Sequence, residues 1–502
     1  MRDLLGRVLE RLPGVRAAVD GHGDASLARY ASGLRRPGPP ALQPLDDLAE
    51  RARVRASDLL GRARAEALAD ALASTGSALT ANHHGLDCLA QSVQGVLVYA
   101  TGSDLHCPVL ACSMVPLSSF SYPRGLRLAR IDPETGAALR VPLFPAGKRY
   151  VLVHCAPPLT PDMAGRASAK VRAMAGHGPV SEDEARFMTR FMDQDCLDPA
   201  VLALPGYADQ ATVLQARLFD RLLPGGPGVT VLELEGLVGD LLRLDLFRDC
   251  LAGSLCLDGR LRGMVLEALD GVEGCWNQAR LAGLARDGGS QDDRAGAGTA
   301  LFWGLDAKGR RVPMACLERG GGAVLAGLSL VSGRNEAESI EVPLRAKDLC
   351  RALDQGRLAP GLFLSYVVIG FARGLRCCGG VFQTDYMRAM RRGLSEALEG
   401  WGAGSEARTV SAVEVANFTA GPEVAFVRDN GGLRPAGLVE LAAVGGLDSS
   451  ALEAAGRLTL RQGLLGGLVD LAEEFVPREE RPRGWRREWD AWLETLSGII
   501  MV

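Results

Sequence analysis

The stretch TANHHGLDC carries the side chains of this chain that are best suited to acid–base chemistry: the amide of Asn82, the imidazoles of His83 and His84, and the carboxylate of Asp87. An aspartate near the start of a helix stays ionised because the helix N-terminus is positive. Such a carboxylate can accept a hydrogen bond from a nearby imidazole, which fixes the tautomer and raises the basicity of the ring. We therefore predict a general base made of His83 and Asp87. His84 is the alternative base, since neighbours in an extended segment point opposite ways.

Histidines and cysteines gather in the same part of the chain. Of the six histidines, four lie within a single stretch, at positions His83, His84, His106 and His154. Two of them, His106 and His154, precede a cysteine at the edge of a predicted strand. Loops at strand ends are exposed while the sheet holds them in place, so reactive groups often collect there. We expect the active site in this region.

Two short blocks here resemble those of the glycerolipid acyltransferases. NHHGLD, which begins at Asn82, is similar to the histidine–aspartate block of that family, with a spacer one residue shorter. YPRGLR, which ends at Arg127, is similar to the phosphate-binding block, with Arg124 in place of the family's acid. The resemblance implies that His83 deprotonates an acceptor hydroxyl, that Asp87 orients it, and that Arg127 contacts a phosphate. We take a reaction type from it, and not family membership.

Other interpretations of the same residues stay open. His83, His84, His106 and His154 are suitable ligands for zinc or iron, although no HExxH, paired CxxC or HxH spacing is present. A cysteine beside a histidine, as in the two His-Cys pairs, is a third source of reactivity, as a thiolate nucleophile. These polar residues can also simply hydrogen-bond their surroundings.

In the C-terminal half, RGLRCCGGVFQTDYM joins Arg373 and Arg376 to a glycine loop. Planar guanidinium groups pair with both oxygens of a carboxylate or phosphate, so both arginines are candidate substrate contacts. The neighbouring cysteines Cys377 and Cys378 are expected to be buried small residues, because a disulfide between neighbours is strained. Thr384 or Asp385 is expected to cap the helix that follows.

The elements that must position these residues follow from hydrophobic periodicity. Apolar runs predict strands in GVLVYA, CPVLACSMVPL, GLRLARI, ALRVPLF and RYVLVHCAP. Turn residues make hairpins of GLRLARIDPETGAALRVPLF and TALFWGLDAKGRRVPMACL, and GVTVLELEGLVGDLLRL is typical of a strand entering a helix. Helices are predicted over 162–222. One helix face carries Trp485, Trp489 and Trp492, and we expect this face to pack against the rest of the folded protein.

The chain is long enough for several domains, and ARDGGSQDDRAGAG (285–298) has the composition of a linker or exposed loop. We predict an α/β or α+β protein with a mixed sheet domain and a second strand-containing part. The predicted division is an N-terminal helical segment (1–78), an α/β core with the His/Cys cluster (79–245), a helical connector and linker (246–298), a second α/β part (299–445) and C-terminal helices (446–502).

Composition narrows the class of protein. Near-balanced charge, −4 overall, argues against a broad nucleic-acid surface, and 47% hydrophobic residues is typical of a folded chain. The first helix is amphipathic and unlike a signal peptide, and the apolar run 358–372 is broken by Pro360, so no membrane span is predicted. Twelve scattered cysteines favour reduced thiols and a cytoplasmic location.

We therefore predict a soluble enzyme for acyl-type transfer or hydrolysis that acts on a small, anionic substrate. In this hypothesis His83 or His84 with Asp87 forms the catalytic group; the residues that contact substrate are Asn82, Arg124, Arg127, Arg373 and Arg376. A metal-dependent enzyme is the alternative, and a scaffold or binding protein without catalysis is the next. The sequence predicts neither a cofactor nor an oligomeric state.

Overall fold

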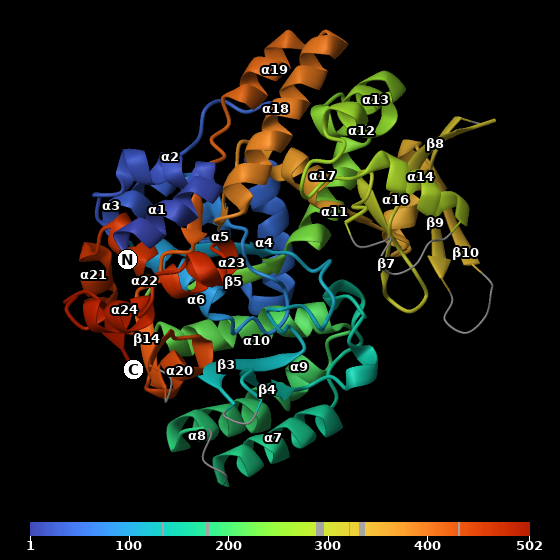
Figure 1. Cartoon of the computed structure of the whole chain (residues 1–502). Coiled ribbons are helices and arrows are strands. Elements are labelled where there is room, and N and C mark those ends of the chain that lie inside the picture. The colour runs from blue at the N-terminus through green and yellow to red at the C-terminus, as the bar shows by residue number, and fades with distance from the viewer. Residues whose placement is uncertain (133–134, 177–179, 288–295, 321, 331–336, 430–431) are drawn as a thin grey trace.

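The computed structural model contains helices and strands in both halves of the chain, which confirms the predicted α/β or α+β class (Figure 1). The structure describes the residues outside six segments: 133–134, 177–179, 288–295, 321, 331–336 and 430–431. The predicted linker begins within α14 (Gln278–Asp287), and its centre lies outside the described residues. The division into five parts stays a prediction.

A five-stranded parallel sheet forms the centre of the molecule. Its strands, in order across the sheet, are β13 (Phe418–Ala420), β12 (Arg376–Gly380), β1 (Ser77–Leu79), β2 (Cys107–Ala111) and β5 (Val229–Glu233). Strands from both sides of the predicted linker therefore share one sheet. Because the strands are parallel, their carboxyl ends meet along one edge, which is where open α/β sheets bind ligands.

The strand order is that of a doubly wound sheet. The chain runs from β1 to β2 and β5 on one side, and later adds β12 and β13 on the other. Successive strands are connected through helices, as parallel pairing requires. The order reverses between β1 and β12, next to the loop that carries NHHGLD.

The sheet is buried on both faces, and alternate residues of its strands enter two different cores. Leu79, Val109 and Val231 belong to one core, and Ala78, Leu110 and Leu232 to the other. The first core is closed by α6 (Ala90–Ala100) and α10 (Tyr207–Leu222); the second is closed by α4 (Asp46–Leu60), α5 (Arg62–Thr75) and α11 (Leu234–Asp245). Burial on both sides explains why β2 and β5 are largely apolar.

The two ends of the chain pack against each other, as the blue and red ribbons in Figure 1 show. The helices involved are α1 (Arg2–Arg11), α2 (Pro13–His22), α3 (Leu27–Leu34), α21 (Ser449–Arg457), α22 (Leu460–Gly466), α23 (Leu468–Phe475) and α24 (Trp485–Leu493). The amphipathic first helix is confirmed. Trp489 is fully buried, with Trp485 and Trp492 packed beside the same core, which confirms the docked face.

Both predicted hairpins are confirmed. β3 (Gly125–Ile131) pairs antiparallel with β4 (Ala138–Pro142), and β6 (Phe302–Leu305) pairs antiparallel with β7 (Arg311–Val312). The other strands are β8 (Ala315–Arg319), β9 (Gly322–Leu330), β10 (Ala337–Pro343), β11 (Leu358–Pro360), β14 (Ala425–Asp429), β15 (Gly432–Pro435) and β16 (Ile500–Met501). The β8–β10 sheet stands out to the right in Figure 1.

The predicted helical stretch 162–222 is confirmed, as is the strand-to-helix transition from β5 into α11. The remaining helices are α7 (Pro161–Gly176), α8 (Glu182–Arg190), α9 (Pro199–Leu202), α12 (Leu251–Leu257), α13 (Gly259–Ala268), α16 (Ala346–Asp354), α17 (Leu362–Tyr366), α18 (Gln383–Trp401), α19 (Gly404–Ser411) and α20 (Leu438–Ala443). Short turns of π-helix are η3 (Phe191–Cys196) and η4 (Val367–Phe371).

Two predicted strands are wrong. GVLVYA forms the second half of α6, which is buried on nearly all sides; a short apolar run of this kind has the same pattern in a buried strand and a buried helix. RYVLVHCAP folds into the 3-10 turn η2 (Val153–Cys155), preceded by η1 (Ala146–Lys148). A single bridge, Pro116 to Leu152, is the remnant of strand pairing there.

The predicted cap of α18 is also wrong. The helix starts at Gln383, with Phe382 as its N-cap. Thr384 donates its hydroxyl to the Val381 carbonyl (2.8 Å), and Asp385 accepts from the Gly14 N–H (2.9 Å). The Asp385 carboxylate, which was expected to cap α18, therefore binds the first turn of α2 instead.

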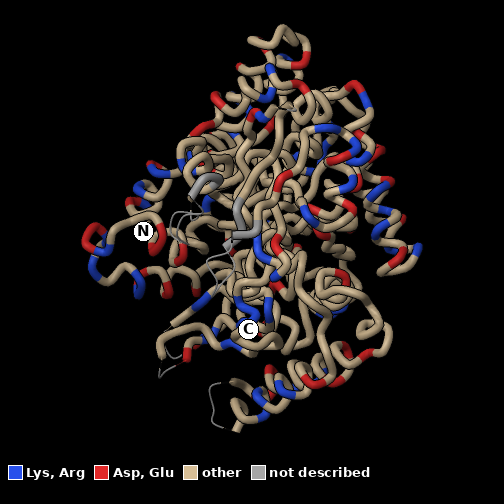
Figure 2. The backbone as a smooth tube through the Cα atoms, turned by 90° about the vertical axis from the view of Figure 1, so that its right-hand side faces the viewer, with Lys and Arg blue, Asp and Glu red and all other residues tan. Residues whose placement is uncertain are grey.

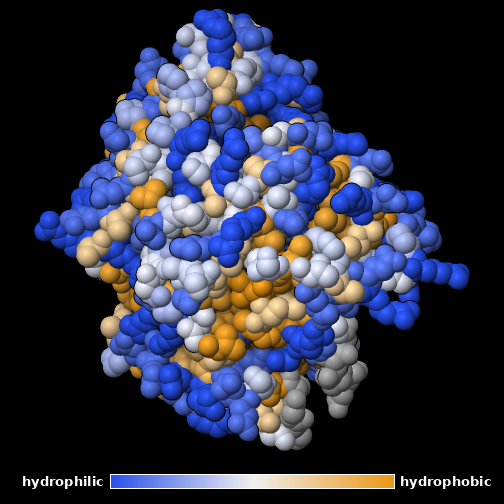
Figure 3. All heavy atoms as spheres, turned by 90° about the vertical axis from the view of Figure 1, so that its left-hand side faces the viewer, coloured by the Kyte–Doolittle hydropathy of each residue, from blue (hydrophilic) through white to orange (hydrophobic). Residues whose placement is uncertain are grey.

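Basic and acidic residues are interspersed along the backbone drawn in Figure 2. The face in Figure 3 is mostly hydrophilic, with several apolar areas, the broadest of them near its centre. Across the residues that the structure describes, no helix combines the length and the apolarity needed to cross a bilayer.

Candidate functional site

The NHHGLD loop is fixed to the end of β2 by backbone hydrogen bonds. Cys112 N–H donates to the Asn82 carbonyl (3.0 Å), and His84 N–H donates to the Cys112 carbonyl (2.8 Å). The ladder between β1 and β2 thus continues past the end of both strands. Alternation along this extended segment separates the two imidazoles, so that His83 and His84 make contacts with different neighbours.

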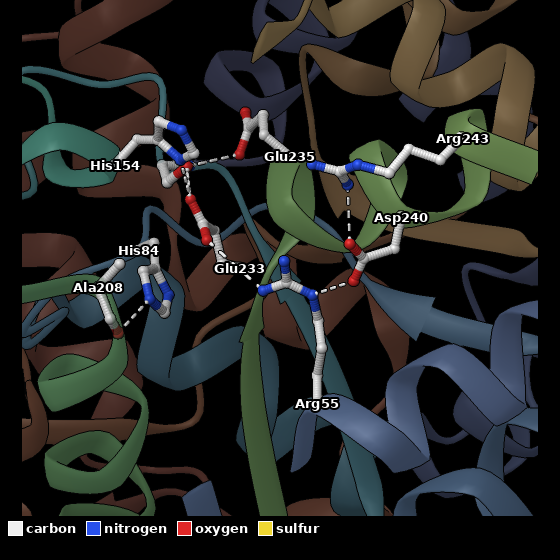
Figure 4. Close-up of polar contacts among 9 residues, drawn as sticks. Arg55, His84, His154, Ala208, Glu233, Glu235, Asp240 and Arg243 are labelled. Carbon is white, nitrogen blue, oxygen red and sulfur yellow. Dashed lines mark hydrogen bonds and ion pairs between the residues drawn. The ribbon is translucent and has the colours of Figure 1, made fainter. Parts of the chain in front are cut away.

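Among the described residues, the closest pairing of an imidazole with a carboxylate is that of His154 and Glu233 (Figure 4). Glu233 is the last residue of β5, and His154 sits in η2. The Nδ1 atom of His154 hydrogen-bonds Oε1 of Glu233. The side chains are 25% and 10% exposed, respectively, so solvent reaches the histidine while the carboxylate is mostly covered.

The charges of the pair shift the pKa of each partner. Burial is the largest single effect and lowers the pKa of His154, but the charge and hydrogen bond of Glu233 and the charge of Glu235 together outweigh it, so the net pKa lies above the usual 6.5. Burial raises the pKa of Glu233, and the charge and hydrogen bond of His154 outweigh it, so that this pKa lies far below the usual 4.5. Both shifts favour an imidazolium beside a carboxylate.

A serine hydroxyl connects Glu233 to a second glutamate. Ser113 Oγ lies 2.7 Å from Glu233 Oε1 and 2.9 Å from Glu235 Oε2, and it can donate its one proton to either carboxylate. The Ser113 N–H also donates to Glu235 Oε2 (2.7 Å). Cys112 Sγ donates to Glu235 Oε1 (2.9 Å). Burial raises the pKa of Cys112 well above its usual value, so Cys112 is a thiol donor and no thiolate nucleophile.

An arginine from α4 supplies positive charge on the other side of Glu233. Arg55 Nη1 lies 3.9 Å from Glu233 Oε2, and its Nε donates to Asp240 Oδ2 (2.6 Å). Arg243 Nη1 donates to Asp240 Oδ1 (2.9 Å), which holds Asp240 in place (Figure 4). The carboxylate of Glu233 is therefore flanked by an imidazole and a guanidinium.

His84 lies beside this group and is fully buried. Its Nε2 contacts the Ala208 carbonyl (2.9 Å), which requires a proton on Nε2. Nδ1 is then a lone-pair acceptor, and among the described residues it has no hydrogen-bond partner. Burial lowers the pKa of His84, so the ring is neutral at pH 7.

His83 has hydroxyl partners, and Asp87 is not one of its ring contacts. Its Nδ1 lies 2.8 Å from Ser121 Oγ and 3.2 Å from Ser119 Oγ. Within the described chain, the carboxylate of Asp87 contacts the backbone of His83 and Leu89 and the amide of Asn82 (3.5 Å), because it turns back to satisfy the loop ahead of α6. The predicted orienting role of Asp87 on the His83 ring is therefore replaced by a structural one.

Burial has opposite effects on the two pKa values in this loop. It lowers the pKa of His83 to about 4. It raises the pKa of Asp87 to about 6, a shift that hydrogen bonds from Ser92, Leu89 and other loop groups only partly oppose. Neither change makes His83 a strong base at neutral pH.

The four clustered histidines do not line one cleft. His106 precedes β2, at the amino end of the sheet, where its Nε2 lies 2.7 Å from Thr230 Oγ1. His83, His84 and His154 follow or face the carboxyl ends of strands. Among the described residues, which include all four, no group of three or more His, Cys, Asp or Glu is placed to hold a metal ion.

The predicted substrate arginines fall into two kinds. Arg373 is fully buried and pairs with both carboxylate oxygens of Asp245 (2.8 and 3.0 Å). Arg376 is buried against Glu414 and the Leu34 carbonyl. Both arginines support the fold from inside.

Arg124 instead follows Pro123, which packs on Gly85, and Arg127 lies near the start of β3. Arg127 donates to the Phe120 carbonyl. The guanidinium of Arg124 lies 5.0 Å from the ring centre of Tyr122, and its Nε has no hydrogen-bond partner among the described residues.

The second half of the chain covers one side of the site. Gly309, in the turn between β6 and β7, accepts a hydrogen bond from Leu152 N–H (2.9 Å). Arg311 Nη1 donates to the Met114 carbonyl (3.3 Å). This hairpin therefore packs against the segments that hold His154 and Ser113.

A local sequence pattern marks Glu233 and Glu235, although neither was among the predicted site residues. In GVTVLELEG, two acids follow an apolar run where a strand passes into a helix. Acids at the end of a buried strand are unusual, because an unpaired carboxylate is costly to bury. Their partners His154, Ser113 and Arg55 carry no such signal, since they come from distant parts of the chain.

Comparison with family models, with curated protein sequences and with solved structures finds no match to this chain. The case for a function therefore depends on the geometry of the site itself.

Proposed function

We propose that this protein is an enzyme for acyl-type transfer or hydrolysis in which His154, oriented by Glu233, is the general base. The observation that carries the proposal is the hydrogen bond between His154 Nδ1 and Glu233 Oε1 at the carboxyl edge of a parallel sheet. This edge is where open α/β sheets bind ligands. His154 with Glu233 takes the place that the sequence suggested for His83 with Asp87.

The pairing sets the direction of proton transfer. Above its raised pKa His154 is neutral, and in that form the carboxylate keeps the ring proton on Nδ1 and leaves the Nε2 lone pair available. Nε2 then takes a proton from water or from an acceptor hydroxyl as that oxygen attacks an acyl carbon. Glu233 stabilises the imidazolium formed, which returns its proton to the leaving group.

The surroundings of His154 indicate how the acceptor group is held. Asp209, an acidic residue in the first turn of α10, lies near Glu233 and Arg55, and Glu235 is linked to Glu233 through Ser113. Carboxylates accept hydrogen bonds, so they suit an acceptor that carries hydroxyl or amine groups. The anionic end of the substrate is assigned to Arg124, a half-buried residue whose Nε has no hydrogen-bond partner among the described residues.

The test uses p-nitrophenyl acetate, a simple acyl donor, with water or hydroxylamine as acceptor. Wild-type protein is compared with His154→Gln and with His83→Gln, a matched change of an imidazole on the same sheet edge. We expect His154→Gln to lower the rate constant by about 10²- to 10⁴-fold, the usual contribution of a general base, and His83→Gln to change it little. Equal rates for wild type and His154→Gln, or no rate above background for the wild type, would contradict the proposal.

A further inference from the structure

Five arginines surround a hollow of about 520 Å³ on the C-terminal part of the molecule, away from the His154 site. They come from β15, from the turn after α23 and from the start of α24: Arg434, Arg478, Arg481, Arg483 and Arg486. Glu473 is the acidic residue of the lining. From this concentration of guanidinium groups we infer that the hollow is a binding site for a small molecule carrying two or more phosphate groups.

Two of the arginines are held in place largely by neutral groups. Arg481 donates to the carbonyls of Val476 (2.8 Å) and Glu473 (3.0 Å). Arg486 donates to the Leu433 carbonyl, and its guanidinium lies 4.5 Å from the ring centre of Trp489. Carbonyl groups and an aromatic ring fix the direction of a guanidinium without cancelling its charge.

Nearby acids compensate only part of the charge. Arg434 Nε lies 3.4 Å from Asp429 Oδ2, and Arg486 Nε lies 4.0 Å from Asp490 Oδ1. Arg478 and Arg483 are exposed, and no ion pair joins them to an acid within the described chain. Asp470, which does not line the hollow, also lies close to Arg486. Of the residues that line the hollow, five are arginines and one, Glu473, is acidic, so the lining itself keeps an excess of positive charge.

The start of α24 adds to the same hollow. Gly484 is its N-cap in a left-handed conformation, with no side chain capping the first turn, and Gly484, Trp485 and Arg486 all line the space. Free N–H groups at a helix N-terminus favour anions. The volume is in the range of small-ligand sites, and Trp485 offers an apolar surface beside the charges. Arginine forks pair with the two oxygens of a phosphate.

Calorimetric titration with pyrophosphate and with ATP in low-salt buffer tests this inference on the full chain. The variant is Arg478→Glu with Arg483→Glu, because both side chains are exposed and the fold does not depend on them. The matched control is Arg392→Glu with Arg408→Glu, two exposed arginines on α18 and α19, which project away from α24 in Figure 1.

We expect wild type and control to bind both compounds with one saturable site. Charge reversal of Arg478 and Arg483 should weaken binding about tenfold or more, since it changes the local charge by four units. Unchanged thermal unfolding of each variant shows that the fold is intact. Absence of binding by the wild type, equal weakening in variant and control, or binding of a single-stranded RNA oligonucleotide without binding of pyrophosphate or ATP would overturn the inference.

Discussion

His154 and Glu233 are 79 positions apart in the sequence, yet Nδ1 of the one is hydrogen-bonded to Oε1 of the other at the end of β5. η2 brings the histidine to the strand end, where Ser113 and Arg55 hold the glutamate from two further directions. A carboxylate fixed in this way can orient an imidazole without moving.

The His154–Glu233 pair should stabilise the protein within a defined pH range. The folded pKa of His154 is raised, so its contribution is fully present below the unfolded value of 6.5 and is lost as pH rises through the folded pKa. The folded pKa of Glu233 is lowered, so its contribution is present above the unfolded value of 4.5 and is lost as pH falls through the folded pKa. Urea unfolding of wild type and His154→Gln should differ by about 1.5–3 kcal/mol at pH 5.5 and by less at pH 9. The same difference at both pH values would argue against the pair.

The Arg373–Asp245 pair should be a strong structural contact. Both side chains are fully buried, so Arg373→Met leaves an uncompensated charge on Asp245 and should lower the free energy of unfolding by about 3–5 kcal/mol. The control is Arg62→Met, which removes an exposed pair with Glu66 and should cost at most about 1 kcal/mol. Similar losses in the two variants, measured by urea unfolding, would show that Arg373 is not structural.

Asp87→Asn should leave the His83 ring unaffected, because their side chains do not pair. The pKa of His83, about 4, should stay the same in a histidine NMR titration of this variant. The raised pKa of Asp87, about 6, means that the wild type loses stability as pH rises from 3.8 to 6. Asp87→Asn should remove that loss. The free energy of unfolding of the variant, measured relative to that of the wild type, should therefore increase as pH rises over this range. A shift of the His83 pKa would restore the His83–Asp87 base.

Acylation by diethyl pyrocarbonate should distinguish the histidines at the sheet edge. His154 is 25% exposed and its Nε2 has no protein partner in the described chain, whereas His84 is fully buried. Peptide mass mapping should therefore find His154 modified and His84 protected in the folded protein. The denatured protein is the control, in which both should react. Early modification of His84 would mean that the site is arranged differently.

Local patterns predicted those parts of the fold that are determined locally. The hairpin β3–β4 follows from Asp132 and Gly136 in its turn, and the first helix follows from the spacing of its leucines. GVLVYA was assigned to a strand because an apolar run without period is compatible with either element, and tertiary burial decided for helix. The capping residue of α18 was missed because Asp385 is used by Gly14, which is distant in sequence.

The site depended on information that no local pattern contains. The sequence placed Asn82, His83 and His84 after a strand, and they do lie at the carboxyl end of β1, the edge to which we assign the site. Spacing alone favoured His83 with Asp87, because these residues are four positions apart. His154 and Glu233 are distant in the sequence, and only the folded chain brings them together. Contacts of this kind depend on how the sheet is assembled from segments that are distant in the sequence, and a single sequence does not reveal them.

A histidine NMR titration of wild type and Glu233→Gln tests the central claim most directly. With six histidines in the chain, assignment by His154→Gln is straightforward. We predict that the pKa of His154 lies above 6.5 in the wild type, that its neutral form carries the proton on Nδ1, and that Glu233→Gln lowers this pKa without moving that of His83. A His154 pKa at or below 6.5 that does not respond to Glu233→Gln would contradict the proposed general base.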